Sequence, residues 1–145
     1  MKTTLKNSRI FQNLPDDQLD SLLAAGNEVR LAAGSSLATK GDPADTAYIL
    51  LSGRIVEQWP DGLVTHDEPG ALLLPTVLLS DQPNEHDWSV DEDSVVFSLT
   101  RAEFKRAFEA QNRAAYAILD EVTQLLVAQL RDLNRVFNEL AQGRV

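Results

Sequence analysis

The stretch Gly41–Gly53, GDPADTAYILLSG, decides the fold of this chain. It opens with Gly41-Asp42-Pro43 and closes with Ser52-Gly53, and both ends consist of residues that favour tight turns. Between them, Tyr48–Leu51 is an apolar run with the length of a buried strand. A buried strand between two turns is typical of an antiparallel sheet, so the sequence predicts a β-rich domain around this stretch.

The same alternation of turn residues and short runs continues on both sides. Turn signals recur at Gly34, Asp61-Gly62 and Pro69-Gly70. Short strands with regular turn signals predict an antiparallel sandwich or barrel. The expected strands are Glu28–Leu31, Ser36–Thr39, Thr46–Leu51, Arg54–Trp59, Leu63–His66 and Val95–Leu99.

Helices are expected at both ends of this β-rich region. Phe11–Ala25 reads as a helix with Pro15 in its first turn and Gly26 as its stop. Thr100 and Glu103 have the spacing of a capping box, so a second helix begins there and ends near residue 110. Residues 112–142 contain no Gly or Pro and predict one long helix. We therefore expect a barrel with an N-terminal helix over residues 1–110 and a long helix over 111–145, in one structural unit.

Composition limits the function classes. The 145 residues suit one domain, and there is no Cys for a disulfide, a thiolate nucleophile or a cysteine metal site. The longest apolar run is too short to cross a membrane, and the N-terminus has no signal-peptide core, so we expect a cytoplasmic protein. Residues 55–100 hold ten acidic side chains and no Lys or Arg, within a net charge of −9. This distribution argues against nonspecific nucleic-acid binding and makes the middle of the domain a poor place for an anion.

The motif around Gly41–Gly53 resembles the cyclic nucleotide-binding domain of the catabolite activator and FNR superfamily. The resemblance runs from about Phe11 to Phe108 and implies a mainly β fold, an antiparallel double-stranded β-helix (jelly-roll) barrel. It also implies a short N-terminal helix and a long C-terminal helix through which family members dimerise. The matching positions are Gly34, Leu37, Gly41, Asp42, Asp45, Tyr48, Ile49, Leu50 and Gly53.

The segment Gly70–Val90, GALLLPTVLLSDQPNEHDWSV, has the length and position of the family's phosphate-binding cassette. In the family, a Gly-Glu pair there accepts the ribose hydroxyl, and an Arg pairs with the cyclic phosphate. An ungapped match puts Leu74-Pro75 at the Gly-Glu pair and Glu85 at the Arg. The resemblance therefore implies a ligand pocket that has lost its polar anchors, formed by Leu74, Pro75, Thr76, Glu85, His86, Asp87 and Trp88.

These replacements predict that the chain does not bind cyclic AMP or cyclic GMP, because Glu85 brings a negative charge to the phosphate position. Three alternatives remain for the pocket. Its own leucines (Leu72–Leu79) fill it, an apolar or uncharged ligand or a partner's side chain enters it, or a cyclic nucleotide still binds. The last alternative requires Arg30, Lys40 or Arg54 to reach in from another strand.

No pattern favours an enzyme. Glu85-His86-Asp87 and His66-Asp67-Glu68 group possible metal ligands, but no His-x-His pair or other metal motif is present. We therefore predict no catalytic residues, no metal and no cofactor.

The long helix carries a heptad pattern that predicts a homodimer, with packing on its own barrel as the alternative. A polar residue, Gln129, interrupts the stripe and would set the register. No helix-turn-helix segment follows, so we do not expect this chain alone to bind DNA. The stripe consists of Leu119, Val122, Leu126, Gln129, Leu133, Val136 and Leu140.

The sequence thus predicts a non-catalytic regulatory or interaction module, acting as a dimer in signalling or transcription-related regulation, with a possible protein partner. The alternative is a sensor in which an unusual small ligand, or a cyclic nucleotide, occupies the barrel and acts on the C-terminal helix.

Overall fold

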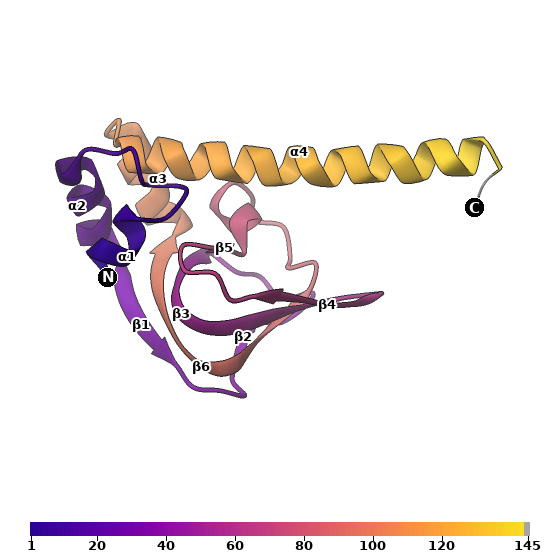
Figure 1. The fold of residues 1–145 in the computed structure, drawn as a ribbon, viewed down its shortest axis with the longest axis horizontal. Helices are drawn as coiled ribbons and strands as arrows, with labels where there is room; N and C mark the ends of the chain where they lie inside the picture. Colours follow the sequence, from indigo (N-terminus) through magenta and orange to yellow (C-terminus); the bar gives the residue numbers. More distant parts are fainter. Residues whose placement is uncertain (144–145) are drawn as a thin grey trace.

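The computed structural model of the protein describes residues 1–143. Six antiparallel strands form one curved sheet, in which β1, β6, β3 and β4 are neighbours in that order, while β2 pairs with β6 and β5 with β3 (Figure 1). Mainly antiparallel strands with flanking helices are the jelly-roll arrangement that the sequence predicts. The strands are β1 (Asn27–Leu31), β2 (Ser36–Ala38), β3 (Thr46–Trp59), β4 (Gly62–His66), β5 (Leu72–Leu73) and β6 (Asp87–Thr100).

Helices gather at one end of the sheet and along one side of it. The short helices lie near the N-terminal end of α4, and α4 runs along the barrel and extends beyond it (Figure 1). The first helix was not predicted from the sequence. The helices are α1 (Lys2–Lys6), α2 (Asp16–Ala25), the 3₁₀ helix η1 (Pro75–Leu78), α3 (Arg101–Glu109) and α4 (Arg113–Ala141).

The strands expected at Thr46–Leu51 and Arg54–Trp59 are one continuous strand, β3. The turn expected at Ser52-Gly53 is instead an irregularity in its pairing with β6. Gly53 has φ +101°, and a Cβ there would collide with Ser94. This close approach is why the strand needs glycine at this point.

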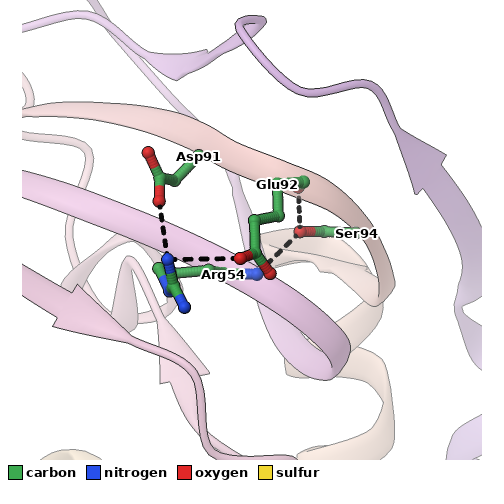
Figure 2. A network of polar contacts seen from close by, with 4 residues as sticks. All are labelled: Arg54, Asp91, Glu92 and Ser94. Atoms are coloured by element: carbon green, nitrogen blue, oxygen red, sulfur yellow. Dashed lines mark hydrogen bonds and ion pairs between the residues drawn. The ribbon is translucent and has the colours of Figure 1, made fainter.

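A polar network fixes β6 beside this irregularity (Figure 2). The guanidinium of Arg54 lies 3.1 Å from Asp91 and 3.2 Å from Glu92. The hydroxyl of Ser94 accepts from the Arg54 amide at 3.1 Å and donates to the Glu92 carbonyl at 2.7 Å. Arg54 is therefore held at the bulge, where its charge is matched by two carboxylates.

The helix expected from Phe11 begins at Asp16. Residues before it form turns, with the Phe11 amide bonded to the Ser8 carbonyl and the Leu14 amide bonded to the Phe11 carbonyl. Pro15 is the N-cap residue, with extended backbone. A helix through Leu14-Pro15 is disfavoured because proline lacks an amide donor and restricts the residue before it.

The other two helix starts are set by side-chain caps. Both hydrogen bonds of the capping box between Thr100 and Glu103 are present, which confirms the predicted start of α3. Asn112 caps α4 by accepting from the amide of Ala115 at 3.1 Å. The N-terminal half of α4 buries Ala114, Ala115, Ile118 and Val122 in the core.

A single core joins the barrel and the helices, with Phe11, Leu19, Ile49 and Phe97 almost completely buried. Within residues 1–143, no helix is both long and apolar enough to span a membrane.

Candidate ligand cavity

A cavity of about 540 Å³ lies between the barrel, the cassette and α4. The β3–β4 hairpin contributes Trp59 and His66, and α4 contributes Leu125 and Gln129. Its volume is within the range of small-molecule sites. Of the three alternatives for the pocket, complete filling by the cassette's own leucines does not match this open space, although Leu72 and Leu74 form part of its wall.

The leucines pack into the core beside the cavity instead of across it. Leu72, Leu73 and Leu78 are each at most 8% exposed and belong to the main hydrophobic cluster. Leu79, in contrast, is 49% exposed. The pairing of β5 with β3, Tyr48 opposite Leu73, draws this part of the cassette onto the sheet and leaves the space beside α4 open.

Leu74 keeps a backbone conformation that favours glycine. It has φ 52° and ψ 50°, one of two non-glycine residues with positive φ among residues 1–143. This conformation costs an L-residue about 1–2 kcal/mol. Burial of the Leu74 side chain, which is 4% exposed, offsets that cost because a buried leucine contributes about 1.5–3 kcal/mol. Leu74 therefore adopts a left-handed backbone conformation that a glycine would adopt without strain.

Arg101 at the start of α3 holds the cassette in place. Its guanidinium donates to the carbonyls of Val77 at 2.6 Å, Ser80 at 2.9 Å and Ala44 at 2.8 Å. These acceptors include the end of η1, so one cation fixes the helix of the cassette to the barrel. The guanidinium of Arg101 therefore binds backbone carbonyls, and Arg101 is not among the residues that line the cavity.

A carboxylate and two histidines form a largely buried cluster in the cavity wall. Glu57 is 9% exposed. Its Oε1 lies 3.2 Å from Nε2 of His66, and its Oε2 lies 3.2 Å from Nδ1 of His86. When each imidazole donates its N–H, both carboxylate oxygens are paired, which is the condition for keeping a carboxylate at this depth.

Two tryptophans stack on these histidines. The rings of Trp59 and His86 are 4.3 Å apart at 24°, and those of His66 and Trp88 are 5.1 Å apart at 16°. The indole nitrogen of Trp59 is buried and has no hydrogen-bond acceptor within residues 1–143. The cavity wall is therefore aromatic around the Glu57 carboxylate.

The remaining charges of the cavity are mostly negative. The only cation among its lining residues is Arg9, which reaches Glu121 of α4 at 2.6 Å. This contact with Glu121 raises the pKa of Arg9 above its ordinary value. Glu68 and Glu85 also line the cavity, and neither has an ion-pair partner within the described chain.

The structure brings six of the seven predicted pocket residues to the cavity: Leu74, Pro75, Thr76, Glu85, His86 and Trp88. Asp87 is not among the lining residues, because its carboxylate accepts from the amide of Lys40 at 2.6 Å. Arg30, Lys40 and Arg54 do not line the cavity either. Within residues 1–143, no group of three His, Asp or Glu side chains is arranged to hold a metal ion.

Sequence reasoning missed Glu57, Arg9 and Glu121. One signal was available for Glu57, because it shares a strand face with Ile55 and Trp59 and so interrupts an apolar face. Nothing in the sequence around Arg9 points to the cavity, since the contact depends on how the N-terminal turns pack against α4.

The predicted dimer stripe divides into two parts. Val122 is fully buried and Leu119 packs on the core, so both belong to the contact between α4 and its own barrel. Leu126 and Gln129, both in the predicted stripe, also line the cavity. The large apolar side chains that α4 leaves exposed include four residues of the predicted stripe, Leu126, Leu133, Val136 and Leu140, and beside them Val127, Leu130 and Phe137.

A model of the family described as "Cyclic nucleotide-binding domain" matches residues 28–111. The chain belongs to this family. The predicted resemblance is therefore confirmed, and the match covers strands β2 to β6, helix α3 and all of β1 except its first residue, Asn27.

Relatives of this cyclic nucleotide-binding domain occur as parts of longer proteins. Glutaminase 1 of Bradyrhizobium diazoefficiens is 27% identical over 88% of this chain, which spans 21% of the glutaminase. A cAMP-dependent protein kinase regulatory subunit of Aspergillus niger is 31% identical over 86% of this chain, which spans 35% of that subunit. The chain thus spans about a fifth to a third of these two relatives.

Solved structures agree on the fold. The catabolite activator protein of Thermus thermophilus superposes with a TM-score of 0.74 at 20% identity, covering 92% of this chain and 63% of that one. A cyclic nucleotide-binding-like protein of Brucella abortus is 28% identical with a TM-score of 0.59, over 74% of this chain and 97% of that one. This cyclic nucleotide-binding domain therefore has the family's mainly antiparallel jelly-roll fold, and its own structure adds the long C-terminal helix α4.

Proposed function

We propose that this chain is a non-catalytic regulatory module of the cyclic nucleotide-binding fold that binds neither cyclic AMP nor cyclic GMP. The charge of the cavity carries the proposal. Four carboxylates line it, those of Glu57, Glu68, Glu85 and Glu121, against the single guanidinium of Arg9. A regulatory role is supported by the kinase regulatory subunit among its relatives.

The magnitude of the electrostatic effect is large. Two like charges about 4 Å apart repel by roughly 4 kcal/mol at an effective dielectric constant near 20. A chain with Glu85 also lacks the charged hydrogen bond that an arginine would make, which contributes about 1.5–3 kcal/mol. Since each 1.4 kcal/mol is about a factor of ten in affinity, the sum of about 5.5–7 kcal/mol would weaken a micromolar affinity by about 10⁴- to 10⁵-fold.

Arg9 does not reverse this balance. Its guanidinium is committed to Glu121, whose side chain is only 5% exposed, and Glu68 lies close enough to interact with the same cation. Moving Arg9 to a phosphate would leave Glu121 buried without its cation, which is costly.

We further propose that the module is a homodimer through the exposed part of α4. Leu133 and Phe137 are 64% and 67% exposed, although they are large apolar side chains on a regular helix. A heptad of such side chains is self-complementary, and pairing with a second copy removes it from water. These exposed side chains lie on the C-terminal half of α4, whereas the N-terminal half packs on the barrel. Dimerisation through them therefore leaves the barrel intact.

Thermal shift with cyclic AMP, cyclic GMP and adenosine at millimolar concentration tests the ligand proposal. Adenosine has the base and ribose of cyclic AMP without the phosphate, so it isolates the phosphate charge. We expect no shift with either cyclic nucleotide and at least as large a shift with adenosine as with cyclic AMP. A concentration-dependent stabilisation by cyclic AMP that adenosine does not give would overturn the proposal.

A further inference from the structure

We propose that the cavity is a binding site for a small organic cation, an ammonium group on an aromatic or apolar body. The inference deepens the proposed function, because it rests on the cavity's rejection of anionic ligands. It names the class of molecule that the same charges and rings would accept.

The charge of the cavity indicates that its ligand is positively charged. With Arg9 and Glu121 paired at 2.6 Å, three further carboxylates remain, on Glu57, Glu68 and Glu85. Within residues 1–143, Glu85 is in no ion pair, and Glu68 interacts with Arg9 only at longer range than Glu121 does. A cavity with low-dielectric walls and one sign of charge concentrates the opposite ion.

The Glu57 cluster provides a charge that is held in place. His66 and His86 lie 3.2 Å from its two oxygens, and in their neutral form each donates one N–H to the carboxylate. Two neutral donors orient the carboxylate without removing its negative charge. An incoming ammonium therefore meets a carboxylate whose position is already fixed, which lowers the entropic cost of binding.

The aromatic rings and the size of the cavity indicate the apolar part of the ligand. Trp59 and Trp88 line it, each with one ring face stacked on a histidine. A remaining indole face attracts a cation more strongly than other aromatic rings do. Leu74, Leu125 and Leu126 supply apolar wall on the cassette and on α4. A volume of about 540 Å³ accommodates a molecule of one or two rings. Carboxylates beside tryptophans fit an amine with an apolar body better than a sugar phosphate.

Calorimetric titration with a matched ligand series tests the proposal. Phenethylamine, 2-phenylethanol and phenylacetate share one aromatic body and differ in carrying an ammonium, a hydroxyl or a carboxylate. Benzyltrimethylammonium adds a cation without N–H donors. At about pH 8, where imidazole is ordinarily neutral, we expect both cations to bind at least about tenfold more tightly than the alcohol, and the carboxylate to show no binding.

Charge-neutralising variants locate the site. Glu85→Gln, on an exposed side chain that the fold does not need, should weaken phenethylamine binding about three- to tenfold, and Glu57→Gln by about tenfold or more. Glu28→Gln on β1 makes the same chemical change outside the cavity lining and should leave the affinity unchanged. Binding of 2-phenylethanol should change little in all three variants.

The outcomes separate this inference from the proposed function. If the cations bind no better than the alcohol, or if Glu28→Gln weakens them as much as Glu85→Gln does, the cation site is overturned while the rejection of cyclic nucleotides stands. A parallel titration with cyclic AMP decides the other claim: tight binding of cyclic AMP overturns the proposed function and this inference together.

Discussion

Nδ1 of His86 lies 3.2 Å from Oε2 of Glu57, so the cassette is tied to the C-terminal end of strand β3 by a carboxylate–imidazole contact. In the ungapped match to the family, His86 directly follows the position of the phosphate-binding arginine. The contact therefore lies next to the position where a family member would bind the phosphate. It holds His86 of the cassette against the carboxylate of Glu57 on the barrel.

A double-mutant cycle on Glu57→Ala and His86→Ala should give a coupling of about 1 kcal/mol in the free energy of unfolding, as expected for two largely buried residues in contact. Urea denaturation measures it. The cycle of Glu28→Ala with His86→Ala is the control, because Glu28 lies on β1 and has no ion-pair partner within residues 1–143. Additivity in both cycles would mean that the Glu57–His86 contact contributes nothing to stability.

Arg101→Ala should destabilise the protein by about 2–3 kcal/mol, because it removes charged hydrogen bonds to three carbonyls. The loss should appear first at η1, as faster amide hydrogen exchange at Val77–Ser80 than in strands β3 and β6. Arg106→Ala on the same helix is the matched control, since its side chain is exposed. Equal losses for the two variants would contradict the role assigned to Arg101.

Gly53→Ala should cost more stability than Gly34→Ala. Both glycines have positive φ, +101° and +87°, so both substitutions incur backbone strain of about 1 kcal/mol. Only at Gly53 would the new Cβ also collide with Ser94, whereas nothing lies within 4 Å of a Cβ at Gly34. Thermal unfolding of the two variants measures the difference, and equal melting temperatures would show that the bulge relaxes freely.

The strands were predictable because their ends are marked locally. Gly, Pro and Asp fix the turns around Gly41 and Gly62, and the capping box of Thr100 fixes the start of α3. The turn predicted at Ser52-Gly53 was wrong because the prediction used only neighbouring residues. A Ser-Gly pair is typical of a turn, but here β6 pairs with the strand and the pair forms an irregularity within β3. Strand β6 supplies that partner from 40 residues away, since Ser94 bonds to Arg54.

The cavity could be predicted only in part. The resemblance to the family predicts the cassette's position and the residues at its anchor positions, including the negative charge of Glu85. The opening of the space depends on long-range packing: β5 draws Leu73 onto β3, and Arg101 anchors η1 from α3. The partners of the histidines are set by strand register, which places His66 across from Ile55, two residues from Glu57. No local pattern contains that information.

The homodimer predicts a mass of about 32 kDa by light scattering, twice the 16.0 kDa of the chain. Leu133→Asp combined with Phe137→Asp should dissociate it, because two charges would be buried in the seam. Leu63→Asp is the control, as Leu63 is 62% exposed on β4 and lies off the helix. A wild-type mass of 16.0 kDa would remove the dimer, and an unchanged mass in the double variant would move the interface off this stripe.

The rejection of cyclic nucleotides is the central claim, and isothermal titration of the wild-type chain with cyclic AMP tests it most directly. We expect no heat of binding at millimolar ligand. The double variant Pro75→Glu with Glu85→Arg, which returns both polar anchors of the family, should show a measurable affinity and so prove that the assay detects binding. Micromolar binding of cyclic AMP by the wild-type chain would contradict the account.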